Sequence, residues 1–304
     1  MNYKRFIPGK KLRLSILKFL SFIPDRTMLK WQYRIKFGEF PDFKNPTNYS
    51  EKIQLYKMYY RNPLAHDCVD KLAVRDYVKD KGLEPILTSL YGVYHRGEDI
   101  DFDSLPSKFV LKTNDGSGGN NIVLCDDKTE LDREVTVKML NSWLNFKNIN
   151  PGREWAYSGI KESLIMAEEF LEAPEDDGSG LMDYKFFCFN GEPCLIQVDG
   201  YRYSGHKRNF YDLNWNPVDL QHTYPNFDHP VARPQNLDRM IEIAKKLSED
   251  FPHVRVDLYN LQGRIYFGEI TFYPGSGYEI FNPQDFDLKL GRKFDLSSFY
   301  PAQN

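Results

Sequence analysis

A glycine loop between two short apolar runs, FVLKTNDGSGGNNIV at 109–123, constrains the fold more than any other stretch of the chain. Phe109–Leu111 predicts a strand that ends at Lys112, and Ile122–Leu124 predicts a returning strand. Residues 114–120 are small or polar turn formers, so a ligand can approach their backbone closely. Successive amides of such a loop can form an anion site, and a lysine beside it adds a point charge for phosphate. Ordinary hairpin loops share this composition, so the loop alone favours a nucleotide only weakly.

A second stretch, Val254–Gly277, places carboxylates on two strands that can pair. Alternating apolar residues precede Leu261-Gln262-Gly263 and a second apolar run follows it, so the pattern predicts a hairpin. Asp257 lies on the first arm and Glu269 on the second. If both side chains face the same side, the two carboxylates can hold magnesium on the phosphates of a nucleotide.

A lysine, a glycine hairpin loop and a late Asp/Glu hairpin, in that order, resemble the ATP-grasp superfamily. The amino-acid sequence is most similar to one branch, the TupA-like ATP-grasp proteins found with capsule and teichuronopeptide synthesis. The segments that carry this resemblance span roughly residues 45–290 and read DKLAVRDYVKDKG, FVLKTNDGSGGN, MAEEFLE, DYKFFCFNGEP and VDLYNLQGRIYFGEITFYPGSG.

The resemblance implies an α+β fold of the ATP-grasp type, in which two α+β lobes and a small lid subdomain clasp ATP. It divides the chain into a basic N-terminal helical region at 1–40, an N-terminal lobe at 41–104, a lid subdomain at 105–165 and a C-terminal lobe with the metal hairpin at 166–304. Within these parts, local patterns predict a helix from Asp67 to Gly82, a hairpin turn at Asn190-Gly191 and a helix over Asn236–Asp250.

ATP and Mg2+ are the cofactors that the resemblance implies. Lys112, Lys185 and Arg255 would be catalytic, because cations can offset charge on a transferring phosphoryl group. Asp257, Glu269 and Thr271 would hold the metal; many ATP-grasp enzymes have Asn at the third position, which puts tight binding of a second magnesium in doubt. The implied nucleotide contacts are Lys71, Lys112, Asn114, Gly116, Ser117, Gly118, Gly119, Asn120, Glu168, Glu169, Phe170 and Glu172.

Different nucleotide contacts would meet different parts of ATP. Glu168 or Glu169 would lie near the adenine amine and Glu172 at the ribose hydroxyls, since a carboxylate accepts hydrogen bonds from both kinds of donor. The backbone of Phe170 would lie at the hinge. A strand edge with solvated acids is the alternative. Lys71 would contact a phosphate, and its alternative is a solvated helix lysine paired with a neighbouring aspartate.

A basic loop and a late turn are the candidate substrate contacts. The loop GYRYSGHKRNF at 200–210 suits an anionic substrate such as a carboxylate or sugar phosphate, and a solvated basic loop is the alternative. The turn Tyr273–Gly277 offers backbone amides to an acyl phosphate. The substrate residues are Arg202, His206, Lys207, Arg208 and Ser276.

The resemblance implies an ATP-dependent carboxylate–amine ligase that forms a C–N amide bond through an acyl phosphate. By family context, the bond would join an amino acid to a uronic acid of a surface polysaccharide. Two other classes remain open: an ATP-grasp phosphotransferase acting on a sugar, and a non-catalytic glycan-binding protein. The presence of Lys112, Asp257 and Glu269 together argues against a site without catalytic activity. No nucleic-acid partner is expected, and the sequence predicts no oligomeric state.

Charge is distributed unevenly along the chain. Residues 1–36 hold ten Lys/Arg and only Asp25 as an acid, so this segment carries +9 and the remainder −12 of the net −3. Lys10–Phe22 has the spacing of a basic amphipathic helix, which can lie on an anionic membrane surface. A helix packed on the body of the protein is the alternative.

The sequence predicts a cytoplasmic protein, peripheral at the inner membrane face if the basic segment binds lipid. It has no run of about 18 apolar residues that could span a membrane. Leu14–Ile23 is interrupted by Lys18 and lacks a small-residue cleavage site, which disfavours a signal peptide. The four cysteines show no CxxC spacing, so we expect reduced thiols.

Overall fold

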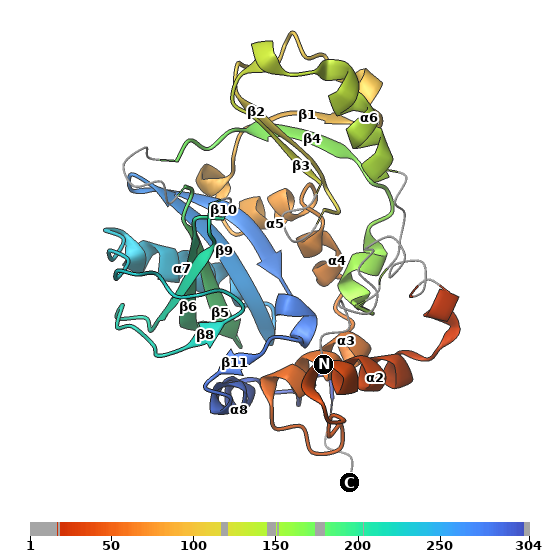
Figure 1. Cartoon of the computed structure of the whole chain (residues 1–304), viewed down its shortest axis with the longest axis vertical. Helices are drawn as coiled ribbons and strands as arrows, with labels where there is room; N and C mark the ends of the chain where they lie inside the picture. Colours follow the sequence, from red (N-terminus) through yellow and green to blue (C-terminus); the bar gives the residue numbers. More distant parts are fainter. Residues whose placement is uncertain are drawn as a thin grey trace.

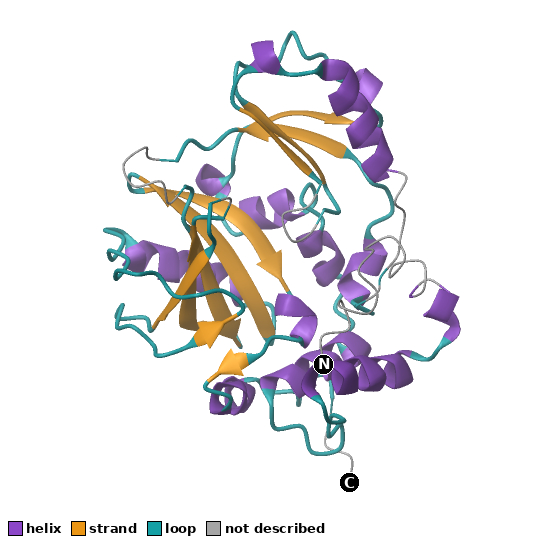
Figure 2. Cartoon of the chain, viewed as in Figure 1, coloured by secondary structure: helices purple, strands orange, loops and turns teal. Residues whose placement is uncertain are grey.

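The described part of the chain forms two larger antiparallel sheets and a two-stranded pair, with helices around them, as Figures 1 and 2 show. The structure is a computed structural model that describes residues 17, 19–116, 121–144, 150, 152–173, 180–202 and 204–300. This combination of helices and antiparallel sheets confirms the predicted α+β class. The small sheet has the order β1-β4-β2-β3, with β1 at Leu90–Tyr94, β2 at Phe109–Thr113, β3 at Ile122–Cys125 and β4 at Ile165–Glu169.

The small sheet has its own apolar core. Helix α6 (Arg133–Leu144) covers it and buries Leu140 against Phe109, Leu111 and Ile165. Strand β1 lies before the predicted lid range 105–165, and β4 begins at its last residue. Both strands complete the sheet because β4 pairs with β1 on one side and with β2 on the other.

The large sheet has five strands in the order β10-β9-β5-β6-β7, and a two-stranded pair, β11-β8, lies beside it. The predicted turn at Asn190-Gly191 joins β5 to β6, and both residues have positive φ, 51° and 77°, as a type I′ turn requires. The bounds are β5 Asp183–Phe189, β6 Glu192–Gly200, β7 Lys207–Tyr211, β8 Gln221–His222, β9 His253–Leu261, β10 Arg264–Thr271 and β11 Phe281–Asn282.

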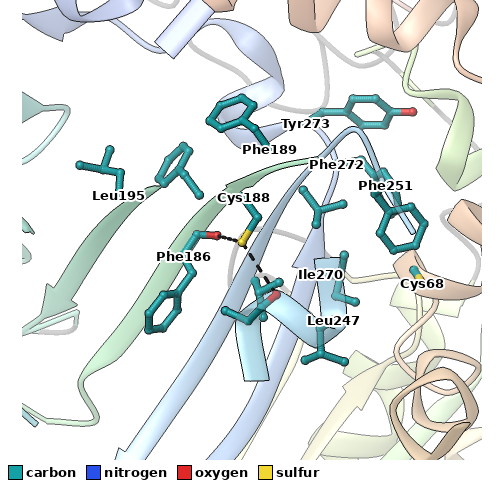
Figure 3. Packing of buried hydrophobic residues seen from close by; sticks show 14 of the residues in the cluster. Cys68, Phe186, Cys188, Phe189, Leu195, Leu247, Phe251, Ile270, Phe272 and Tyr273 are labelled. Atoms are coloured by element: carbon teal, nitrogen blue, oxygen red, sulfur yellow. Dashed lines mark hydrogen bonds between the residues drawn. The ribbon is translucent and has the colours of Figure 1, made fainter. Parts of the chain in front are cut away.

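One face of the large sheet is apolar and the other is polar. Figure 3 shows Phe186 and Cys188 of β5 on the apolar side, where the Cys188 thiol points to the carbonyl of Ala244. Helix α7 (Leu237–Ser248) buries Leu247 and Ala244 here, and each fully buried apolar side chain of leucine size contributes about 1.5–3 kcal/mol. Because side chains alternate along a strand, Asp183 and Lys185 of β5 point to the opposite face.

The N-terminal helices pack on the same core as the large sheet. Helix α3 (Tyr49–Tyr59) buries Ile53, Leu55 and Tyr56 in the cluster that also holds the sheet's apolar residues, and it contacts α8 (Asp285–Lys293). The prediction of one helix from Asp67 to Gly82 is wrong. The chain forms α4 (Leu64–Val69) and α5 (Val74–Asp80), because Asp70 adopts an extended backbone between them and accepts hydrogen bonds from two amides beyond it.

The basic N-terminal segment is only partly described. Most of the predicted helix Lys10–Phe22 lies outside the described residues. The next helix, α2 (Asp25–Phe37), buries Met28, Leu29 and Tyr33 against the body of the protein. Among the helices that the structure describes, none combines the length and apolar character needed to cross a bilayer. The remaining short 3-10 turns are η2 Leu20–Phe22, η3 Glu84–Ile86, η4 Gly97–Asp99, η5 Lys128–Glu130, η6 Trp155–Gly159 and η7 Pro274–Gly277.

Candidate active site

The hairpin of β9 and β10 places its two predicted carboxylates on one face. Asp257 and Glu269 are partners in the strand register, next to a bulge between Phe267 and Glu269. Gly268 occupies the bulge, where a Cβ would come within 2.9 Å of the Asp257 carbonyl oxygen. The guanidinium of Arg255 joins the pair, at 2.7 Å from both oxygens of Asp257 and 3.5 Å from Glu269 Oε1.

Strand β5 adds a lysine to this group. Lys185 lies opposite Asp257 in the register and contacts Asp257 Oδ2 and Asp183 Oδ2, each at 2.5 Å. Burial would lower the pKa of Lys185, but the two aspartates outweigh it and raise the pKa above its ordinary value. The predicted catalytic residues Lys185 and Arg255 are therefore held as cations by shared carboxylates.

Charges from three elements converge on Glu269. Burial would raise the pKa of this carboxyl, but Lys71, Lys185 and Arg255 lower it to about 2. Lys71 lies between α4 and α5, whereas Lys185 and Arg255 belong to the large sheet. Glu269 is thus an ionised carboxylate at the place where the helical turn approaches the sheet.

The oxygens of the hairpin are suitable donors for magnesium, with one constraint. Asp257, Glu269 and Thr271 supply two carboxylates and a hydroxyl, and the hydroxyl of Thr271 lies 3.2 Å from Glu269. Magnesium often takes only one or two protein carboxylates and completes its shell with phosphate and water. The described residues hold no group of three or more His, Cys, Asp or Glu side chains placed for a metal. Both oxygens of Asp257 accept bonds from Arg255, so a metal there would replace one of these partners.

The small sheet brings a second lysine toward an acid. Lys112, the residue before the end of β2, contacts Glu168 of β4 at 2.5 Å, while Arg75 of α5 lies 3.6 Å from the same carboxylate. Glu169, next in the strand, points the other way and accepts a hydrogen bond from the amide of Ser89 at 2.9 Å. Of the two acids predicted near adenine, only Glu168 lies with Lys112.

The glycine loop and Lys71 contact each other directly. The Lys71 amide donates to the carbonyl of Asn114 at 3.0 Å, and its ammonium donates to the carbonyl of Gly116. The Asn114 side chain donates to Asp70 at 2.7 Å, so the loop is fixed to the turn between α4 and α5. Lys71 is therefore not the solvated helix lysine of the alternative interpretation. The other predicted loop contacts, Ser117, Gly118, Gly119 and Asn120, lie outside the described residues.

The hinge segment after β4 contains the last two predicted nucleotide contacts, Phe170 and Glu172. Phe170 follows the last residue of β4, and its side chain is half-buried. Glu172, predicted at the ribose, is mostly exposed and forms an ion pair with Lys108 at 2.8 Å. The structure thus brings together Lys71, Lys112 and Glu168, and leaves Glu172 at the surface.

The predicted substrate cations are already engaged with acids of the protein. Arg208 donates to both oxygens of Asp199, at 2.5 and 2.9 Å, and its third nitrogen lies 2.7 Å from His222. Burial would raise the pKa of the Asp199 carboxyl, but His206 and Arg208 lower the pKa below its ordinary value. His206 lies 3.5 Å from Asp199. The remaining contacts are Arg202 to Asp183 at 3.2 Å and Lys207 to Asp228 at 3.2 Å.

Ser276 lies in a strained turn that a buried lysine holds. Gly275 and Ser276 have positive φ, 52° and 57°, a conformation that is unfavourable for serine. The Lys57 ammonium donates to the carbonyl of Ser276 at 2.6 Å and contacts its hydroxyl at 2.9 Å. Gln54 also donates to this turn, and Ser276 donates to Glu154. Sequence reasoning missed Lys57, Gln54 and Glu154, because only the folded chain brings α3 and the segment before η6 to this turn.

Comparisons with known proteins identify a family and similar solved structures. A family model described as TupA-like ATPgrasp matches residues 51–295, whereas a search of curated proteins found no match. Among solved structures, the chain is similar to a D-alanine–D-alanine ligase from Bacillus anthracis, at TM-score 0.45 and 16% identity over 77% of this chain and 64% of that chain. It is also similar to an L-amino acid ligase from Bacillus licheniformis, at TM-score 0.45 and 15% identity over 90% and 57% of the two chains.

The chain spans less than two thirds of the length of either solved protein. The family match covers residues 51–295, from within α3 through α8, and includes Lys71, Lys112, Lys185 and Asp257. It confirms the resemblance and the ATP-grasp fold that the motifs predicted. The chain belongs to the TupA-like ATPgrasp family.

Proposed function

We propose that the protein is an ATP-dependent carboxylate–amine ligase that joins an amino acid to a uronic acid of a surface polysaccharide. The observation that carries the proposal is the pair of cations at the carboxylate hairpin: Lys185 and Arg255 both contact Asp257, and Arg255 lies 3.5 Å from Glu269. Buried cations held in place by the carboxylates of a hairpin suit a site that receives a polyphosphate and transfers its terminal phosphoryl group. The identity of the two substrates rests on the family resemblance.

ATP would lie between the small sheet and the polar face of the large sheet; Figure 1 shows the small sheet above the large sheet. Lys71 and Lys112 would contact its phosphates, since cations bind anions. Lys185 and Arg255 would offset the charge that moves with the γ-phosphoryl group to the carboxylate substrate. Magnesium, when bound by Asp257, Glu269 and Thr271, would supply Lewis-acid stabilisation of phosphate oxygens.

The acyl phosphate would then react with the amine substrate. The amine nitrogen forms a bond to the acyl carbon, the acyl C–O bond to phosphate breaks, and the products are an amide, phosphate and a proton. Glu168, beside Lys112, is our choice for the contact with the adenine amine, because a carboxylate accepts hydrogen bonds from that donor. None of these steps requires a covalent enzyme nucleophile.

The test is a screen of amino acids against uronic-acid glycans that measures ADP release and product mass together. The proposal predicts ADP release that depends on both substrates and a product heavier than the glycan by one amino-acid residue. Lys185→Met should abolish both signals, whereas Lys289→Met, an exposed lysine on α8, should change neither. A phosphorylated sugar without an amide would instead identify a phosphotransferase, and glycan binding without ADP release a binding protein.

We also propose that the N-terminal region contacts anionic lipid at the cytoplasmic face of the membrane. Residues 1–36 carry +9, and the outer face of α2 exposes apolar side chains: Trp31 is 56% and Ile35 44% exposed. Phe40, in the loop after α2, packs on Trp31 at 5.2 Å between ring centroids. Basic residues beside exposed aromatic side chains suit the interface of an anionic bilayer.

A further inference from the structure

Two buried hydrogen-bond acceptors on the polar face of the large sheet have no donor. Among the described residues, six buried side-chain atoms have no hydrogen-bond partner, and two of them, Asp183 Oδ1 and Gln197 Oε1, lie on this face. Such orphaned groups are rare in folded proteins, so a pair of them indicates a site that another molecule completes.

Two of the orphaned atoms, on Asp183 and Gln197, belong to neighbouring strands. Asp183 pairs with Asp199, and Lys185 pairs with Gln197, so Asp183 and Gln197 are diagonal neighbours on one face of β5 and β6. Each residue is only 1% exposed. The other polar atom of each side chain is bonded: Asp183 Oδ2 accepts from Lys185, and Gln197 Nε2 donates to Asp199 at 3.0 Å.

The charged side chains nearby restrict the kind of ligand that Asp183 Oδ1 and Gln197 Oε1 can bind. Four carboxylates of this face contact four cations: Asp183, Asp199, Asp257 and Glu269 against Lys185, Arg202, Arg208 and Arg255. Each of these four cations is therefore already paired with a carboxylate of the protein. Asp183 Oδ1 and Gln197 Oε1 can only accept hydrogen bonds, so the missing partner is a group with at least two N–H or O–H donors.

We infer that Asp183 and Gln197 bind the amino group of the amine substrate. This inference rests on the proposed ligase function and specifies which end of which substrate meets the sheet. A primary ammonium carries three N–H donors, enough for both acceptors. Asp183 lies two residues from Lys185, so an amine bound there is adjacent to the side chains that would handle the phosphoryl group.

This assignment differs from the prediction that the loop at 200–210 binds an anion. Arg208 already donates to Asp199 and lies against His222, and Arg202 contacts Asp183. In the inferred site these arginines hold Asp183 and Asp199 in place. The unmet demand of the site is for donors, which an amine supplies and a carboxylate or phosphate does not.

A first test needs no knowledge of the true substrates. The probes are methylammonium, which has three N–H donors, and tetramethylammonium, which has none. At ten times its dissociation constant, a ligand of the folded state raises the thermal midpoint by about 3 °C for a chain of this size. We expect methylammonium to raise the midpoint of the wild type more than tetramethylammonium does, and expect this difference to vanish in Asp183→Asn and Gln197→Met. Asp285→Asn, an exposed carboxylate on α8, should retain the difference.

A second test uses the amide-forming reaction. In Gln197→Met, the KM for the amine should rise about tenfold, the effect of losing one hydrogen bond to a charged group, while the KM values for ATP and the carboxylate substrate stay within about twofold. Equal shifts with both probes, an unchanged amine KM, or a rise in the carboxylate KM alone would overturn the inference. If neither variant folds, the two acceptors are structural and the inference fails. The probe experiment gives its result even if no ligase activity is found, so failures of the two proposals can be told apart.

Discussion

Replacing Lys57 by methionine should alter the pH dependence of stability in a defined direction. The Lys57 side chain is 0% exposed, and Glu154, the nearest acid, lies 4.0 Å away. Its ammonium donates to Ser276 and to Gln54 at 3.1 Å. Burial lowers the pKa of Lys57 from 10.5 to about 8, although Glu154 partly offsets the effect. Methionine has a similar length and no charge, so Lys57→Met removes the titration and keeps most of the volume.

The sign follows from proton binding in the two states. The pKa of Lys57 is lower in the folded chain than in the unfolded chain, so between pH 8 and 10.5 the unfolded chain binds more protons and stability rises with pH. The unfavourable burial of the ammonium contributes about 3 kcal/mol at pH 7 and about 1 kcal/mol at pH 9.5. The wild type should therefore gain about 2 kcal/mol of unfolding free energy relative to Lys57→Met over this interval.

The measurement is urea unfolding of both proteins at pH 7.0 and pH 9.5, compared as a difference so that titrations common to both cancel. Lys289→Met, an exposed lysine paired with Asp285, is the control and should track the wild type at both pH values. Equal wild-type and Lys57→Met differences at the two pH values would refute the reasoning. That result would mean that the ammonium is solvated and that Ser276 is held by other contacts.

The remaining predictions concern the nucleotide, the metal and the membrane. Asp257→Asn and Glu269→Gln should each lose magnesium-dependent ADP formation and keep a native circular-dichroism spectrum; wild-type turnover in either variant would contradict the metal assignment. Lys112→Met should weaken ATP binding by about 1–3 kcal/mol, measured by calorimetry, because it removes a hydrogen bond to a charged group. The protein should co-sediment with anionic vesicles at low salt and not at high salt, and Trp31→Ala should reduce this binding; removing residues 1–24 should abolish it without unfolding the chain.

Local patterns were sufficient to predict the hairpins of the site. Asn190-Gly191 predicted the turn of β5 and β6, because few other dipeptides tolerate positive φ at both positions. Alternation over 254–271 predicted that Asp257 and Glu269 lie on paired strands, and the register places them opposite each other. In both cases the determining interactions are local in sequence, so the residues themselves contain the information.

Long-range packing decided the features that the sequence did not reveal. Asp67 was predicted to begin a single helix, yet Asp70 interrupts it, because its side chain both caps the next turn and accepts a bond from Asn114 of the glycine loop. The role of Lys57 depends on a contact with Ser276, 219 residues further along the chain. No periodicity within α3 distinguishes Lys57 from a surface lysine, since its burial results from a turn that the helix meets only after folding.

The ion pairs of the polar face explain how a cation-rich site can exist before a nucleotide arrives. An isolated buried lysine or arginine would be costly, but Asp183, Asp257 and Glu269 hold Lys185 and Arg255 in one place and one protonation state. Positions fixed in advance reduce the reorganisation needed when charge moves onto the substrate. The same pairing limits free affinity for anions, because a phosphate must compete with these carboxylates for the cations. A ligand that engages Asp257 or Glu269 therefore releases Lys185 and Arg255 toward phosphate, which couples occupancy of the carboxylate hairpin to nucleotide binding.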